Sequence, residues 1–287
     1  MKVCSDVAAL RELTAGWRAQ KQRIAFVPTM GNLHDGHLSL VEIAARHAER
    51  VVVSIYVNPL QFAPDEDFDT YPRTLRDDLD RLRAFKVDAV FTPDNRVMYP
   101  QGEQQCTYVE VPGLSDILEG ECRPGFFRGV ATVVLKLFNM VQPDVAVFGE
   151  KDFQQLLVIR KMVRDLDLPV EIIGGPIRRE ADGLAMSSRN RYLSETDRKK
   201  SCLLSETLVK MRDQINNHFD IEKTRADAVK QLEANGFSVD YLTVREVETL
   251  REIKTVSDCT ACEVVILAVA RLGGTRLLDN LRFTLPR

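Results

Sequence analysis

Short apolar runs alternate with segments of helical period over roughly the first 175 residues of the chain. The run at 51–57 is almost continuously apolar and rich in valine, which suits a strand that is buried on both faces. Such an alternation predicts a parallel sheet with helices on both of its faces. The expected strands are residues 24–28, 51–57, 89–92, 145–148 and 170–173, and the expected helices are residues 37–48, 74–85, 131–141 and 152–166.

The pattern changes after Gly174-Gly175-Pro176. Ser194 to Asp197 form a capping-box sequence that predicts the start of a long polar helix, and a second helix is expected at 226–234. Three strand-like runs at 239–244, 264–270 and 276–281 close the chain and predict an antiparallel sheet. The expected fold class is therefore α/β: a Rossmann-like, doubly wound parallel sheet at 1–176, followed by a smaller C-terminal α+β domain at 177–287.

Charge and hydropathy exclude several classes of protein. The 287 residues carry a formal net charge of -3, which argues against a nucleic-acid partner because phosphate backbones require a basic face. No apolar stretch approaches the ~18 residues of a membrane span. The N-terminus lacks the apolar region of a secretory signal and carries Asp6. We therefore expect a cytoplasmic protein with no membrane partner.

The cysteines give no sign of a disulfide framework. The six are scattered along the chain, as thiols in a reducing compartment usually are. Cys259 and Cys262 form a single CxxC, but it precedes an apolar strand-like run instead of opening a helix. We therefore expect ordinary thiols there and no redox role.

Two histidines stand where the first long strand is expected to turn into a helix. His34 and His37 are three residues apart and so face one side of a helical turn. Helix N-termini attract anions through free N–H groups and the helix dipole, and ligands collect at the carboxyl ends of parallel strands. A zinc site would need a third ligand, and neither His47 nor His218 has a suitable spacing. A nucleotide triphosphate fits better, although an ordinary glycine turn with two surface histidines would look the same.

Three further polar segments follow strands or lie at the domain boundary. Asn58 and Gln61 follow one strand, where amides could bind a small hydroxy acid or simply form a turn. Lys151 follows another strand and could neutralise phosphate charge, or could be a solvated lysine at a capped helix start. The loop at 182–191 carries Ser187, Ser188 and Arg189, which could bind a polyphosphate, or it is a polar connection. The stretch at 123–129 could be a lid or a plain turn.

Each segment alone is weak evidence for a function, but together they favour nucleotidyl transfer on a Rossmann-like sheet. The chain has no P-loop, no GxGxxG fingerprint and no obvious Ser-His-Asp set to compete with this interpretation. The motifs PTMGNLHDGH, VNPLQF, YPRTL, RPGFFRGVAT, FGEKDFQQL and DGLAMSSRN occur in this order along the chain. With these motifs the chain resembles the pantothenate synthetase (pantoate–β-alanine ligase) family of HIGH-motif nucleotidyltransferases, which are related to class I aminoacyl-tRNA synthetases.

The resemblance implies a two-step reaction. The carboxylate of pantoate attacks the α-phosphorus of ATP to give pantoyl adenylate and pyrophosphate, and the amine of β-alanine then displaces AMP. It further implies Mg²⁺ with the ATP, ligated in part by Asp152, and a homodimer. The partners expected from it are ATP, pantoate and β-alanine.

The resemblance also assigns roles to particular residues. His34, His37 and Lys151 are the expected catalytic residues, with His37 as a proton donor. Gln61, Gln155 and Asn58 are expected to bind pantoate or β-alanine. The ATP site is expected to comprise Met30, Gly31, Asn32, Leu33, His34, Asp35, Gly36, His37, Gly149, Glu150, Lys151, Asp152, Arg178, Met186, Ser187, Ser188 and Arg189. Position 178 departs from the apolar residue found in many relatives, so only its backbone is expected to meet adenine.

Two other functions share parts of this pattern. A tRNA-charging or tRNA-modifying relative would carry the same two phosphate motifs, but it predicts a basic surface and an anticodon-binding module. A non-catalytic nucleotide sensor would keep ATP binding and lose the amides or the phosphate-binding cations. The chain keeps Gln61, Gln155, Lys151 and Arg189, so the enzyme is favoured.

Overall fold

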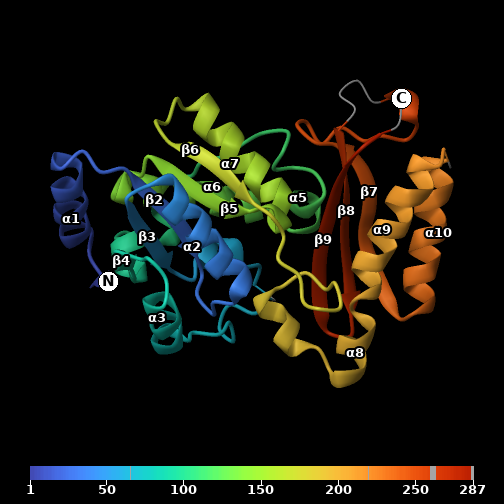
Figure 1. Cartoon of the computed structure of the whole chain (residues 1–287), viewed down its shortest axis with the longest axis horizontal. Helices are drawn as coiled ribbons and strands as arrows, with labels where there is room; N and C mark the ends of the chain where they lie inside the picture. The colour runs from blue at the N-terminus through green and yellow to red at the C-terminus, as the bar shows by residue number, and fades with distance from the viewer. Residues whose placement is uncertain (65, 219, 259–262, 286–287) are drawn as a thin grey trace. The chain divides into compact units, whose positions relative to one another are not determined.

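The computed structural model describes residues 1–64, 66–218, 220–258 and 263–285, so Cys259 and Cys262 lie outside the described residues. The chain divides into two compact units (Figure 1). The first comprises Met1–Glu150 and Gln154–Pro176, and the second comprises Lys151–Phe153 and Ile177–Arg287. The short segment around Lys151 therefore belongs with the C-terminal part of the chain, although it follows a strand of the first unit.

A six-stranded parallel sheet forms the centre of the first unit, in the order β1-β4-β3-β2-β5-β6. The α/β class expected from the alternation of apolar runs is confirmed. All five strands expected in this region are present, and the structure adds β1 at the sheet edge. The strands are β1 (Lys2–Cys4), β2 (Ile24–Thr29), β3 (Arg50–Ile55), β4 (Ala89–Phe91), β5 (Val145–Gly149) and β6 (Glu171–Gly175).

Strand β2 has helices on both of its faces because successive side chains point to opposite sides of a sheet. Ala25 and Val27 belong to the same buried cluster as the apolar residues of α2 (Asp35–His47), which runs in front of the sheet in Figure 1. Phe26 points the other way and meets Phe138 of α6 (Phe126–Val141), with ring centroids 6.3 Å apart. The whole of this strand core is inaccessible to solvent.

The other helices of the first unit show where local signals were incomplete. The sequence did not suggest α1, although Asp6 caps it by accepting from the Ala9 N–H at 2.8 Å. Helix α6 begins before the expected 131, directly after a turn in which Gly125 has a φ of 84°, so the stretch at 123–129 is a turn and a helix start. The remaining helices are α1 (Val7–Ala19), α3 (Leu75–Arg83), α4 (Asn95–Met98), α5 (Glu119–Cys122) and α7 (Phe153–Asp165). None of the helices in the described ranges has the length and apolarity needed to span a bilayer.

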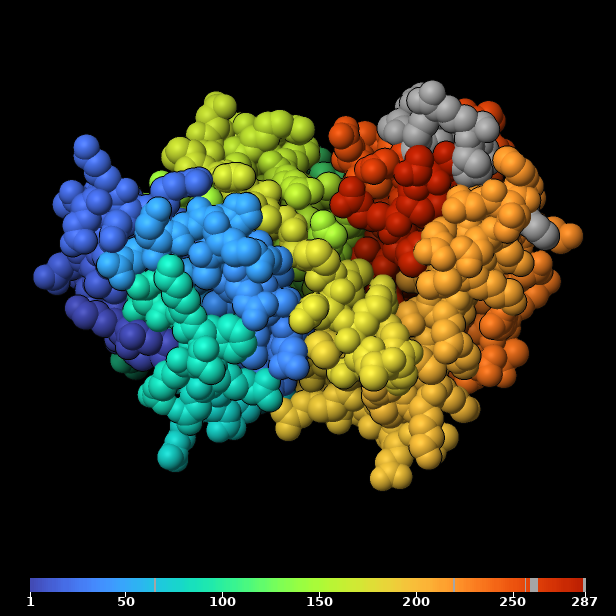
Figure 2. Space-filling view, in the orientation of Figure 1, coloured from blue at the N-terminus to red at the C-terminus, as the bar shows by residue number. Residues whose placement is uncertain are grey.

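The second unit is built on an antiparallel sheet of three strands in the order β7-β8-β9, as the sequence predicted. The strands are β7 (Phe237–Glu246), β8 (Glu263–Leu272) and β9 (Thr275–Thr284). Side chains from α9 (Leu203–Asn216) and α10 (Ile221–Ala234) pack with these strands in one apolar cluster. The space-filling view shows the orange surface of these two helices next to the red strands (Figure 2).

The single long helix expected after Ser194 is wrong in one respect, because the structure contains two helices. Ser194 caps α8 (Glu195–Lys200) as predicted and accepts from the Asp197 N–H at 3.1 Å. The chain then turns at Ser201 before α9 begins. The buried Ser201 hydroxyl donates to the Arg198 carbonyl at 2.8 Å, and such local bonds compete with helix continuation.

Replacing Phe26 by alanine should destabilise the first unit by about 3–5 kcal/mol, because it leaves a cavity against Phe138 in a close-packed core. Trp17, the single tryptophan, lies in α1 of this unit, so its fluorescence during urea unfolding measures the change. Leu166→Ala is the control, since that side chain is half exposed and should change the free energy of unfolding by less than about 0.5 kcal/mol. Equal effects of the two substitutions would contradict this description of the core.

Candidate active site

The strand order reverses between β2 and β5, because β3 and β4 are added on one side of β2 whereas β5 and β6 are added on the other. In open α/β sheets, ligands bind at the carboxyl ends of the strands on either side of such a point. Residues 30–37 follow β2, and Glu150 follows β5 directly. The segment with Asn58 and Gln61 follows β3, the other neighbour of β2. Three of the polar segments singled out in the sequence therefore leave adjacent strands at one edge of the sheet.

The two histidines are held by backbone N–H groups at the start of α2. His34 is the N-cap residue, and its Nδ1 accepts from the Gly36 N–H at 3.1 Å. Nδ1 of His37 accepts from the His34 N–H at 3.3 Å, and the two ring centroids are 4.1 Å apart. Since Nδ1 is the acceptor in both rings, each neutral imidazole carries its proton on Nε2. In this tautomer each ring can donate from Nε2, and N–H donors near a helix N-terminus suit an anion.

The loop before the histidines is fixed by one buried carboxylate. Asp78 of α3 is 2% exposed and accepts from the Asn32 N–H at 2.9 Å and the Leu33 N–H at 2.7 Å. Thr74 donates its hydroxyl to the same carboxylate at 3.2 Å. The loop itself turns through left-handed backbone at Gly31, whose φ is 81°. A Cβ at that position would lie 3.0 Å from the carboxylate, so the glycine allows the close approach.

Sequence reasoning did not identify Asp78. It lies in a helix with several other acidic residues, and its buried position depends on a contact between segments 45 residues apart. No local pattern distinguishes it from exposed Asp77, so only the tertiary structure reveals its role.

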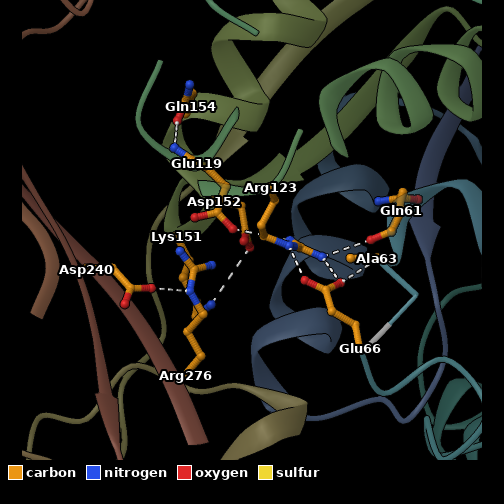
Figure 3. Close-up of polar contacts among 10 residues, drawn as sticks. All are labelled: Gln61, Ala63, Glu66, Glu119, Arg123, Lys151, Asp152, Gln154, Asp240 and Arg276. Atoms are coloured by element: carbon orange, nitrogen blue, oxygen red, sulfur yellow. Dashed lines mark hydrogen bonds and ion pairs between the residues drawn. The ribbon is translucent and has the colours of Figure 1, made fainter. Parts of the chain in front are cut away.

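The segment carrying Gln61 is held in place from two directions. Asn58 is 1% exposed and donates from Nδ2 to Oε1 of Gln61 at 3.0 Å. Arg123 donates to the Gln61 carbonyl at 2.8 Å and forms a bidentate pair with Glu66, with distances of 2.5 and 2.6 Å (Figure 3). Arg123 also pairs with the buried carboxylate of Glu119 at 3.2 Å. Its guanidinium therefore joins the Gln61 loop to the turn before α6.

The two consecutive glutamines at the start of α7 have different surroundings. Gln154 is 6% exposed and donates from Nε2 to the carbonyls of Leu114 and Ile117, at 2.7 and 2.8 Å. Its Oε1 accepts from the Glu119 N–H at 3.2 Å. Gln155 is only partly buried, and among the described residues its side chain has no hydrogen-bond partner. Gln154 therefore holds the backbone around residues 114–119 in place, whereas the side chain of Gln155 is available to a ligand.

In the second unit, strand β9 holds the backbone near Lys151. Asn280 donates from Nδ2 to the Lys151 carbonyl at 2.8 Å, and it is itself 3% exposed. The Lys151 ammonium lies 3.9 Å from the half-exposed Asp152 carboxylate. The lysine and its carboxylate neighbour are thus anchored through the main chain.

The loop at 182–191 is anchored on the same strand. Arg179, at its base, forms a bidentate pair with the buried Asp279 at 2.7 and 2.9 Å and also donates to the Gly183 carbonyl. Arg178 accepts the Met186 N–H through its carbonyl at 2.9 Å. Ser187 then caps a short 3₁₀ helix, Ser188–Tyr192, by accepting from the Arg189 N–H at 3.3 Å.

The candidate residues thus fall into two sets. Met30 to His37, Asn58, Gln61, Gly149, Glu150 and Gln155 belong to the first unit, whereas Lys151, Asp152, Arg178 and Met186 to Arg189 belong to the second. Their joint action on one ligand stays a prediction. In the described part of the chain, no group of three or more His, Cys, Asp or Glu side chains could hold a metal ion by itself.

Comparison with known proteins gives similarity over nearly the whole chain. The model of a family described as pantoate-beta-alanine ligase matches residues 2–282. A pantothenate synthetase from Xanthomonas axonopodis pv. citri (strain 306) is 52% identical over 283 residues, which cover 99% of this chain and 100% of the relative. A pantothenate synthetase from Shewanella oneidensis is also 52% identical, with 99% of each chain covered.

Two solved structures show the same similarity in three dimensions. The crystal structure of pantothenate synthetase from Thermus thermophilus has a TM-score of 0.90 at 45% identity, covering 98% of this chain and 99% of that one. The structure of pantoate-beta-alanine ligase from Francisella tularensis has a TM-score of 0.79 at 31% identity, covering 98% and 97%. That protein is complexed with "Beta-gamma ATP" and beta-alanine.

Asp78→Asn should loosen the loop before the histidines, because one of its two carboxylate acceptors becomes an amide that cannot accept a backbone N–H. We expect a loss of about 1–3 kcal/mol in the free energy of unfolding and faster hydrogen exchange at the Asn32 and Leu33 amides. Trp17 fluorescence and NMR exchange measure the two effects. Asp80→Asn, on the exposed face of α3, is the control and should leave both values nearly unchanged. Unaltered exchange of these two amides in Asp78→Asn would show that Asp78 does not hold the loop.

Proposed function

The chain belongs to the pantoate-beta-alanine ligase family, and we propose that it condenses pantoate with β-alanine to form pantothenate, using ATP through a pantoyl adenylate. The observation that carries this proposal is the pair of imidazoles at the start of α2, both with Nδ1 occupied by backbone N–H groups. The relative complexed with an ATP-type ligand and β-alanine supports it.

The first step transfers AMP to the carboxylate. An oxygen of pantoate attacks the α-phosphorus of ATP, and pyrophosphate leaves with the electron pair of the broken P–O bond. Negative charge builds up on the phosphate oxygens, and His34 and His37 donate to them from Nε2. Lys151 adds a positive charge that stabilises this negative charge. No covalent bond to the protein is needed, because the reaction depends mainly on alignment and charge stabilisation.

The other phosphate contacts come from the loop of the second unit. Ser187 and Ser188 supply hydroxyl donors, and Arg189 supplies a guanidinium for the leaving pyrophosphate. Met186 and the backbone of Arg178 share a hydrogen bond at the base of this loop. In this proposal they contact the nucleoside. Residues 30–37 and 149–152 complete the ATP site in this proposal.

Amide side chains bind the hydroxy acid. Gln61 and Gln155 bind its hydroxyl and carboxylate oxygens, and Asn58 lies next to Gln61. In the second step, the neutral amine of β-alanine attacks the acyl carbon, AMP leaves, and the amine loses a proton to give the amide.

Mg²⁺ fits this site only as a partner of the nucleotide. Asp152 offers one half-exposed carboxylate, and no three-ligand cluster exists among the described residues. An ion held by one carboxylate, phosphate oxygens and water suits the preferences of Mg²⁺. When bound, it would neutralise part of the charge on the phosphates.

The proposal is tested by incubating the protein with ATP, pantoate and β-alanine and measuring pantothenate, AMP and pyrophosphate. Equal amounts of the three products are expected. Without β-alanine, the protein should still exchange labelled pyrophosphate into ATP, and this exchange should require pantoate. Formation of ADP instead of AMP, or exchange that does not depend on pantoate, would contradict the adenylate route.

His37→Ala and Lys151→Ala should each lower the rate of pantoate-dependent exchange by about 10²–10³, which is typical for the loss of one charge-stabilising donor. His47→Ala is the matched control, because this histidine lies exposed at the far end of α2 and should leave the exchange unchanged. The urea midpoint of each variant shows whether the fold survives. Near-normal exchange in both variants would contradict the proposed roles of His37 and Lys151 in charge stabilisation.

A further inference from the structure

A buried chain of hydrogen bonds leads from Tyr99 to Gln61. The Tyr99 hydroxyl lies 2.7 Å from Oδ1 of Asn58, and Nδ2 of Asn58 lies 3.0 Å from Oε1 of Gln61. Nδ2 of Asn58 also lies 3.2 Å from the carbonyl of Gly129 in α6. Tyr99 and Asn58 are 3% and 1% exposed, so solvent does not compete for the bonds of Asn58 to Tyr99 and to Gly129.

The carbonyl of Gly129 determines which group donates and which accepts in each of these hydrogen bonds. A carbonyl can only accept, so it must face the amide nitrogen of Asn58 and not the amide oxygen. The oxygen of Asn58 then faces Tyr99, which must donate. Burial raises the pKa of the Tyr99 phenol above its usual value, so this hydroxyl keeps its proton over the whole neutral range.

The same direction passes on to Gln61. Both N–H groups of Asn58 are used, one by Gly129 and one by Gln61, and the latter therefore turns its oxygen to Asn58. Nε2 of Gln61 is left as the outward end of the amide, and among the described residues it has no hydrogen-bond partner. Arg123 fixes the main chain of the same residue through its carbonyl.

Close contact between α6 and the Gln61 loop makes this arrangement possible. A Cβ at Gly129 would lie 2.2 Å from the Leu60 carbonyl oxygen, well inside the closest distance that side chains reach. The glycine thus brings its own carbonyl within reach of Asn58. The orientation of the Gln61 amide therefore depends on the packing of α6 against the Gln61 loop.

We propose that Tyr99 is a positioning residue that acts through Asn58 to hold Gln61 with its N–H donors toward the substrate, so that this point of the site selects an oxygen acceptor of the hydroxy acid. This inference rests on the proposed function for the identity of the substrate. It assigns Asn58 an indirect role, because both of its N–H groups are donated within the protein.

Tyr99→Phe removes only the hydroxyl and keeps the ring. With its oxygen no longer held, the Asn58 amide loses one of the contacts that fix Gln61, so the KM for pantoate should rise about tenfold, the equivalent of one lost buried hydrogen bond. The KM for ATP should stay within about twofold, because the chain does not involve the nucleotide residues. Steady-state kinetics measures both constants.

Tyr56→Phe is the matched control. Tyr56 is also buried, its ring lies 6.5 Å from that of Tyr99, and its hydroxyl donates to Asn95 at 2.8 Å without touching Asn58. Removing it should leave the KM for pantoate unchanged. A purely structural role for these tyrosines would instead raise this KM equally in both variants, and that result would overturn the proposal.

A measurement without turnover separates this inference from the proposed function. In ¹⁵N NMR of the whole protein, both side-chain N–H protons of Asn58 should be protected from exchange, and Tyr99→Phe should speed their exchange at least about tenfold while Tyr56→Phe does not. If wild-type protein made no pantothenate, the proposed function would fail while this exchange could still be read. Unchanged Asn58 exchange in Tyr99→Phe would overturn the positioning role whatever the activity.

Discussion

The burial of β2 between two layers of helices is the constraint on which the rest of the first unit depends. This strand pairs with β3 on one side and β5 on the other, and it is inaccessible to solvent over the positions that face α2 and α6. Because all three strands are parallel, their carboxyl ends lie at one edge. The loops that leave them carry the paired histidines, the Asn58–Gln61 turn and Glu150. The parallel strands that form the apolar core therefore also bring these polar loops to the same edge of the sheet.

Loops at such an edge have little stability of their own, and buried polar side chains supply what they lack. Asp78 holds the loop before His34, and Arg123 holds the turn at Gln61. In the second unit, Asp279 in the same way holds the base of the serine–arginine loop. In each case a charged group binds backbone or a charged partner where little water reaches it, so the hydrogen bond is strong and its loss is costly. Gln155, proposed to bind the substrate, can then keep its side chain without a hydrogen-bond partner among the residues that the structure describes.

Sequence patterns predicted the elements better than the contacts between them. Strands and most helices followed from periodicity, and the segments with His34, Gln61 and Lys151 were placed correctly after their strands. The break between α8 and α9 was missed because its residues are all acceptable in a helix. The supporting residues were missed because their partners are distant: 46 residues separate Asp78 from Asn32. No spacing rule connects positions so far apart.

The sequence by itself determined the α/β class, the change of pattern near residue 176 and the kinds of side chain that follow each strand, because hydrophobic periodicity and turn residues act over a few positions. Only the tertiary structure decided the strand order, and with it which loops share an edge. It alone also decided the direction of the amides at Asn58 and Gln61, because that direction comes from a carbonyl of α6 that the fold brings against them. Hydrogen-bond polarity in a buried cluster depends on all its members at once, so no single stretch of chain contains it.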